Sequence, residues 1–93
     1  MIKEFRDKNA KRLFNREPSR KLPTEIHRTA LRKLRMLNRA KTIDDRRAPP
    51  GNRLEALKGN RHGQYSIRIK ERWRICFVWD QGDVYGVEII DYH

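Results

Sequence analysis

The residues best suited to chemistry stand at the last three positions of the sequence, Asp91, Tyr92 and His93. They follow a run from Val84 to Ile90 that is typical of a β-strand. A carboxylate, a phenol and an imidazole can each accept or donate a proton. A strand that leads directly into His93 would order it, and its own α-carboxylate would favour the protonated imidazole. We therefore expect acid/base chemistry here, although a terminal histidine is often only frayed and solvated.

Arg74 and Lys58 could complete a site for RNA cleavage. Arg74 interrupts an otherwise aromatic strand, and Lys58 follows the apolar step from Leu54 to Leu57. When a 2′-hydroxyl attacks the neighbouring phosphorus, the site needs a base, a cation for the growing phosphoryl charge and an acid for the leaving 5′-oxygen. These residues and the terminal tripeptide could fill the three roles without a metal. Alternatively, Arg74 is merely a solvated side chain on an open sheet face.

The charge of the chain predicts a polyanionic partner. Its 93 residues include 23 Lys and Arg but 12 Asp and Glu, for a formal net charge of +11. Residues 1–41 hold 14 of these basic and 4 of these acidic residues, and the remainder holds 9 and 8. The folded protein would repel itself unless RNA, DNA or an acidic protein supplied counter-charge. We expect docking in the first part and chemistry in the second.

Length and residue usage bound the class of protein. A chain of 93 residues suits one domain over residues 1–93 with a single thin core. The one cysteine, Cys76, cannot form an intrachain disulfide and is expected to be a small buried side chain. No signal-peptide core and no membrane-spanning run is evident, so we expect a cytoplasmic protein. No Cys, His and carboxylate cluster has zinc-like spacing, so no metal or other cofactor is expected.

The basic first part is expected to form two helices. After a possible edge strand at residues 1–5, apolar residues recur at helical spacing and predict a short helix that ends before Pro18. A longer amphipathic helix is expected from Pro23, placed in its first turn, to about Thr42. The apolar positions of this longer helix are Ile26, Ala30, Leu31, Leu34 and Leu37.

The second part alternates apolar and polar residues, which predicts three strands joined by tight turns. The alternating apolar residues are Tyr65, Ile67 and Ile69, then Trp73, Ile75, Phe77 and Trp79, then Tyr85, Val87 and Ile89. The helices would cover this face and leave Arg68, Lys70 and Arg74 on the other. The expected fold is therefore α+β, a compact domain with two N-terminal helices packed on a small antiparallel β-sheet.

Several other residues have structural interpretations. Trp73 and Trp79 could stack on bases, but core packing is the better interpretation because they share the alternation of the apolar face. His27 is expected on the surface of the longer helix, and His62 in a turn that could touch phosphate. Residues 42–52 are expected to form the loop between the two parts, because prolines and a glycine break helix there.

Four segments, in this order and spacing, resemble the HigB branch of the RelE-type bacterial toxins. They are PPGNRLEALKG at 49–59, GQYSIRI at 63–69, WRICF at 73–77 and DYH at 91–93. The resemblance implies a toxin that enters the ribosomal A site and cuts messenger RNA during translation. It further implies neutralisation by a cognate helix-turn-helix antitoxin encoded beside it, and we expect the complex of the two to bind operator DNA.

The resemblance also implies roles for individual residues. Lys58 and Arg74 would bind the scissile phosphate and stabilise its transition state, while Asp91, Tyr92 and His93 would supply positioning and proton transfer. The cations expected to bind RNA around them are Arg53, Arg61, Arg68 and Lys70.

Glu55 departs from the family pattern, because some members have a histidine at this position. It could act as the base for the 2′-hydroxyl, or it could repel phosphate and slow the reaction. If His93 is protonated it is the better acid, and Glu55 or Asp91 becomes the better base. The identity of the base stays open.

Two alternatives to a ribosome-dependent, metal-independent endoribonuclease remain. One is a non-catalytic basic module that occupies ribosomal RNA or DNA and inhibits by occlusion. The other is a gyrase-directed toxin on the same fold, an activity with no evident need for the terminal acid/base residues.

Overall fold

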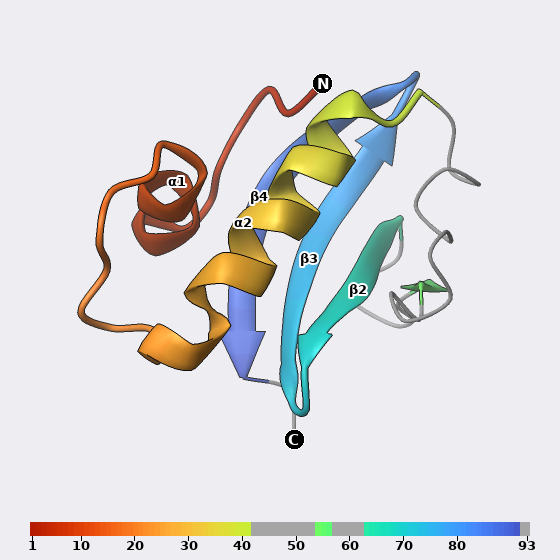
Figure 1. The fold of residues 1–93 in the computed structure, drawn as a ribbon. Coiled ribbons are helices and arrows are strands. Elements are labelled where there is room, and N and C mark those ends of the chain that lie inside the picture. The colour runs from red at the N-terminus through yellow and green to blue at the C-terminus, as the bar shows by residue number, and fades with distance from the viewer. Residues whose placement is uncertain (42–53, 57–62, 92–93) are drawn as a thin grey trace.

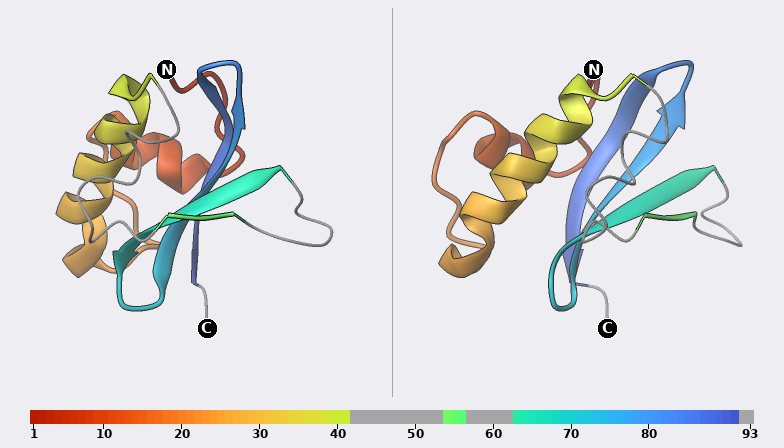
Figure 2. Two further views of the ribbon diagram at one scale, coloured as in Figure 1. Left: turned by 90° about the vertical axis from the view of Figure 1, so that its right-hand side faces the viewer. Right: turned by 45° about the vertical axis from the view of Figure 1, so that its right-hand side comes forward.

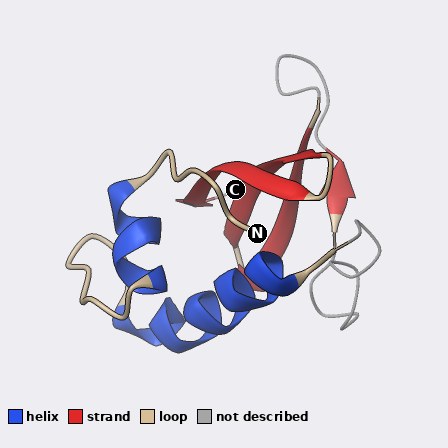
Figure 3. Ribbon diagram, turned by 90° about the horizontal axis from the view of Figure 1, so that it is seen from above, coloured by secondary structure: helices blue, strands red, loops and turns tan. Residues whose placement is uncertain are grey.

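The computed structural model describes residues 1–41, 54–56 and 63–91, and in them two helices precede a four-stranded sheet. In chain order the elements are α1 (Lys8–Phe14), α2 (Thr24–Arg39), β1 (Glu55–Ala56), β2 (Gln64–Lys70), β3 (Trp73–Asp80) and β4 (Asp83–Asp91). The helices form one layer and the sheet the other (Figures 1 and 3). The predicted α+β class and the predicted order of helices before an antiparallel sheet are confirmed.

Helix α2 covers the sheet with an apolar side. Its buried residues are Ile26, Ala30, Lys33, Leu34 and Leu37. Pro23 is the N-cap residue and not, as expected, a residue of the first turn. The helix ends at Arg39, before the expected end near Thr42, because Ala40 already has an extended backbone. The Ala40 N–H closes the last turn by donating to the Met36 carbonyl at 3.0 Å.

The N-terminal residues run along β4 instead of forming a regular strand. Isolated parallel bridges join Ile2 to Val84 and Phe5 to Val87. The Lys3 N–H donates to the Val84 carbonyl at 2.8 Å. The expected edge strand at residues 1–5 is therefore present only as two separate bridges.

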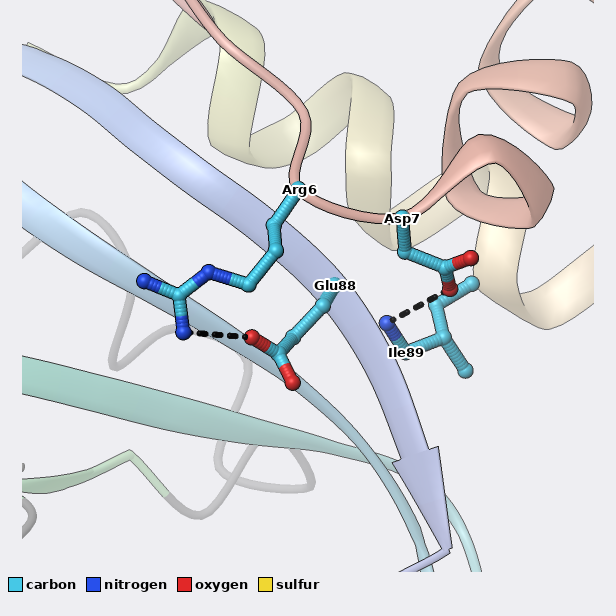
Figure 4. Close-up of polar contacts among 4 residues, drawn as sticks. All are labelled: Arg6, Asp7, Glu88 and Ile89. Atoms are coloured by element: carbon cyan, nitrogen blue, oxygen red, sulfur yellow. Dashed lines mark hydrogen bonds and ion pairs between the residues drawn. The ribbon is translucent and has the colours of Figure 1, made fainter.

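Two carboxylates fasten the start of α1 to β4 (Figure 4). Asp7 is the N-cap residue of α1, and its Oδ1 accepts a hydrogen bond from the Asn9 N–H at 2.9 Å. Its Oδ2 accepts from the Ile89 N–H of β4 at 3.3 Å. Arg6 pairs with Glu88 of β4, with 3.2 Å between Nη1 and Oε2. One carboxylate thus satisfies backbone donors of both a helix and a strand.

The four strands pair in chain order, β1-β2-β3-β4, and every pair is antiparallel. The expected meander of β2, β3 and β4 is confirmed (Figure 2). The sequence prediction did not include β1, whose two residues pair Glu55 with Ser66 and Ala56 with Tyr65. A two-residue strand is too short to show the alternation on which strand prediction depends.

One expectation for β4 is wrong. The register of β3 and β4 shifts just after Cys76, and Gly86 of β4 has a positive φ of 57° there. The extra residue reverses the alternation, so that Val84 and Val87 both belong to the core. Tyr85, predicted to share a face with Val87, is instead half-buried outside the core cluster.

A single apolar cluster joins the helices to β2, β3 and β4. Its buried members are Ala10, Leu13, Leu22, Ile26, Ala30, Leu34, Leu37, Ile67, Ile69, Ile75, Phe77, Val84, Val87 and Ile89. Trp73 and Trp79 pack half-buried against it, and Cys76 is fully buried, which confirms the predicted core roles. No helix in the described part of the chain has the length and apolar character needed to cross a membrane.

Candidate active site

Arg74 is a buried arginine held by the neighbouring strand. It is 7% exposed, so the alternative of a solvated arginine on an open sheet face is wrong. Its Nε donates to the Ser66 Oγ at 2.8 Å, and its Nη2 donates to the Ser66 carbonyl at 3.2 Å. Because the guanidinium is planar, two bonds to one residue fix both its position and its tilt. Arg74 is thus oriented before any ligand binds.

Arg68 adds a second positive charge beside Arg74. The two residues are register partners on β2 and β3. Residues directly opposite on one sheet face have Cβ atoms about 5 Å apart, and like charges in this position destabilise the pair. Arg68 is half-buried, whereas Lys70 is exposed at the end of β2, beyond a register shift. Of these two predicted RNA-binding residues, the structure places Arg68 beside Arg74 and Lys70 at the strand end.

Lys33 brings a third cation from the helix layer, and the sequence prediction missed it. It is 6% exposed and lies on α2. Burial lowers the pKa of Lys33 below its usual value, and the charges of Arg32, Arg68 and Arg74 lower it further, in that order. The lysine therefore senses both sheet arginines across the layers. A usable signal existed, because Lys33 lies three residues after Ala30 and four before Leu37, within the apolar stripe.

Glu55 lies beside the same serine that holds Arg74. In the β1–β2 register Glu55 is opposite Ser66, so both side chains share a sheet face. Glu55 is exposed and Ser66 is fully buried. The structure therefore brings Glu55, Ser66, Arg68 and Arg74 to one region of the sheet. A carboxylate at the exposed side of a cationic site is placed to accept a proton.

Asp91 has a different environment. Its Oδ1 pairs with the Arg72 Nε at 2.9 Å. Its register partner is Trp73, whereas the partner of Arg74 is Ile90. Because strand residues alternate between faces, Asp91 begins on the face of Trp73, opposite that of Arg74. The ion pair with Arg72 fits a positioning role at the end of β4.

Five predicted site residues lie outside the described residues: Arg53, Lys58, Arg61, Tyr92 and His93. Their roles stay predictions, as do the expected loop at 42–52 and the turn around His62.

His27 is not the free surface residue that was expected. It is half-buried, and its Nε2 lies 2.9 Å from the Leu22 carbonyl. This contact joins α2 to the segment before it, which is a structural role. No group of three or more His, Cys, Asp or Glu side chains that could hold a metal ion occurs within residues 1–41, 54–56 and 63–91.

These groups together define an anion-binding site on a small α+β protein. A buried arginine fixed by Ser66, a second arginine opposite it and a buried lysine within electrostatic reach surround one place. In a low-dielectric site such cations stabilise a phosphoryl charge more strongly than they would in water. The fold and the site thus define a basic phosphate-binding protein.

Comparison with known proteins places the chain in a family. Residues 3–93 match the family described as the RelE-like toxin of the type II toxin-antitoxin system HigB. The chain is 39% identical over 83 residues to Toxin HigB-1 of Vibrio cholerae, covering 88% of this chain and 87% of that protein. It is 32% identical over 93 residues to Endoribonuclease HigB of Proteus vulgaris, covering 100% of both. The chain belongs to the HigB-like family of type II toxins, which confirms the resemblance and implies a cognate antitoxin as partner.

Proposed function

We propose that this toxin is an endoribonuclease that cuts messenger RNA on the ribosome by attack of a 2′-hydroxyl on the adjacent phosphate. The observation that carries the proposal is the buried Arg74 guanidinium, fixed by two hydrogen bonds to Ser66. A cation held in place before the reaction stabilises developing phosphoryl charge without reorganisation. The name of the Proteus vulgaris relative, Endoribonuclease HigB, supports the same activity.

The reaction divides among the site residues by their chemistry. Arg74, together with Lys58, neutralises charge on the attacked phosphate, and Arg68 helps to hold the RNA strand. Glu55 is the candidate base for the 2′-hydroxyl, since its register position beside Ser66 brings it near Arg74. His93 is the candidate acid for the leaving 5′-oxygen. Bond formation at phosphorus from O2′ and loss of O5′ leave a 2′,3′-cyclic phosphate and a 5′-hydroxyl, with no metal or cofactor consumed.

The exposed side of α2 supports docking to ribosomal RNA. Arg28, Arg32, Arg35 and Arg39 follow one another at helical spacing, and with Leu31 they line a shallow groove of about 280 Å³. Three of these arginines are exposed and Arg35 is half-buried. A row of cations along a helix suits an RNA backbone, whose charge recurs along its length. The toxin would act in the cytoplasm, under control of a helix-turn-helix antitoxin whose complex with it binds operator DNA.

The same arginine row favours a second candidate function. A chain that merely occupies ribosomal RNA or DNA through α2 would inhibit without cutting, and its binding would weaken steeply with salt. Both functions need the α2 arginines, but only the enzyme needs Arg74 for turnover.

The experiment is a reconstituted translation reaction with the purified full-length chain. Messenger RNA should be cut only while ribosomes translate it, and the downstream fragments should carry a 5′-hydroxyl. Arg74→Ala should lower the rate constant for cleavage by about 10²–10³-fold, the scale seen when one transition-state donor is removed. Arg6→Ala is the matched control, because Arg6 is an exposed arginine paired with Glu88 on the edge strand.

The outcomes separate the two functions. Intact messenger RNA together with blocked translation would support occlusion and overturn the enzyme. Cleavage by Arg74→Ala at the rate of Arg6→Ala would overturn the assignment of Arg74.

A further inference from the structure

The two buried charges in the described part of the chain are both cations. They are Lys33 on α2, 6% exposed, and Arg74 on β3, 7% exposed. Lysine is rarely buried unless its charge has a partner or a task, because its ammonium group loses strong hydration. A methionine of similar length could fill the same space at no electrostatic cost. The lysine at this position therefore calls for a reason other than packing.

The surroundings of Lys33 make its burial more costly. Arg68 and Arg74 repel its charge from the sheet, and Arg32 does so from the same helix. Arg68 and Arg74 are themselves opposite each other in register. Like charges at short range raise the free energy of the folded state, and more so away from bulk water. The cluster thus stores repulsion contributed by α2, β2 and β3.

We propose that Lys33 is an RNA-binding residue that joins Arg68 and Arg74 in holding one phosphate of the bound RNA. An anion seated among the three cations turns their mutual repulsion into attraction, so part of the binding free energy comes from relief of this repulsion. The proposal rests on the proposed function for the identity of the anion. It extends the site from the sheet into the helix layer, where the sequence pattern had indicated only core packing.

A phosphate fits the cluster better than a single carboxylate does. Two guanidinium groups and an ammonium group offer donors from several directions, and a phosphodiester presents two charged oxygens together with bridging oxygens. Ser66 fixes one of the guanidinium groups through its Nε and leaves the cluster anchored on the sheet. A helix-borne cation above a sheet-borne pair would also fix how the RNA strand crosses the sheet.

The test uses the purified full-length chain and a single-stranded oligonucleotide with every 2′-hydroxyl methylated, which cannot be cut by 2′-hydroxyl attack. Binding is measured by titration, and folding by the thermal midpoint in low salt without oligonucleotide. Lys33→Met removes the charge and keeps the length. Lys33→Arg keeps the charge, and Lys11→Met removes an exposed lysine of α1 as the matched charge control.

The proposal predicts a two-part signature. Lys33→Met should bind the oligonucleotide about tenfold more weakly, the scale of one hydrogen bond to a charged group, and yet unfold at a higher temperature than wild type. Lys11→Met should change binding far less, and Lys33→Arg should retain most of the affinity. A merely structural lysine would give the opposite thermal shift, because its removal would lower the midpoint.

Several results would overturn the proposal. Equal binding by Lys33→Met and Lys11→Met would do so, as would a folded Lys33→Arg that has lost its affinity. Weakened binding of the antitoxin with unchanged binding of the oligonucleotide would show that the anion is a protein carboxylate. If Lys33 governs binding but the wild type does not cut messenger RNA, the binding site stands and the endoribonuclease fails; if cutting persists without any dependence on Lys33, only this inference fails.

Discussion

At the scale of single residues, the chemistry depends on how one serine holds one arginine. Ser66 contributes a hydroxyl and a backbone carbonyl to Arg74, and it lies opposite Glu55. Neither Ser66 nor its bond was predictable from the alternation of β2, because a small polar residue on a strand is most often a surface choice. Its burial becomes evident only when the strands are paired.

Ser66→Ala should lower the cleavage rate constant about tenfold, because Arg74 would keep its charge but lose its orientation. Ser19→Ala is the matched control, since Ser19 is also a buried serine and donates to Asn9 Oδ1 at 2.8 Å, near α1. Both variants should lose some stability, but only the first should lose turnover. Equal rate constants for the two variants would contradict the positioning role of Ser66.

Lys33 predicts a specific pH dependence of stability. Its pKa is lowered in the folded protein, so the unfolded chain binds more protons in the window between the lowered pKa and the usual value near 10.5. The free energy of unfolding should therefore rise with pH through this window. The cause is burial together with the charges of Arg32, Arg68 and Arg74.

The measurement is the difference in unfolding free energy between Lys33→Met and wild type, by urea denaturation from pH 7 to pH 10.5. The advantage of the variant should be largest near neutral pH and should shrink towards the alkaline end. A difference that stays constant across the range would mean that the charge of Lys33 does not oppose folding.

At the scale of elements, long periodic segments were predictable and local irregularities were not. The apolar spacing of α2 and the alternation of β2 and β3 each involve several residues, so a packed core follows directly from them. The bulge at Gly86, the two-residue β1 and the N-cap position of Pro23 depend instead on pairing between distant segments. Tyr85 was misplaced for this reason, since one extra residue reverses every later side chain.

The junction of α1 with β4 should be sensitive to one carboxylate. Asp7→Ala removes the acceptor for Asn9 and for Ile89, and should lower the free energy of unfolding by about 1–2 kcal/mol. Asp7→Ser retains a capping oxygen and should cost less. Chemical denaturation with Asp80→Ala, an exposed aspartate at the end of β3, gives the reference. A loss in Asp7→Ala no larger than in this reference would mean that the cap does not join the two elements.

At the scale of the whole molecule, the helix layer and the sheet divide the work. The strongly basic residues 1–41 form the helices and the strip along β4, whereas the more balanced remainder carries Arg74 and Glu55. This division was predictable from the charge distribution alone. Lys33 is the exception, because it extends from the docking layer into the site. Docking through α2 would thus be coupled directly to the grip on phosphate.

The central claim is that the Arg74 site cuts messenger RNA during translation. The most direct test is to map the 5′ ends of messenger RNA in cells after induction of the wild-type chain, Arg74→Ala and Arg6→Ala at matched protein levels. Wild type and Arg6→Ala should stop growth and produce new ends within translated regions, and Arg74→Ala should do neither. Growth arrest by Arg74→Ala with the same new ends, or arrest by wild type with intact messenger RNA, would contradict the account.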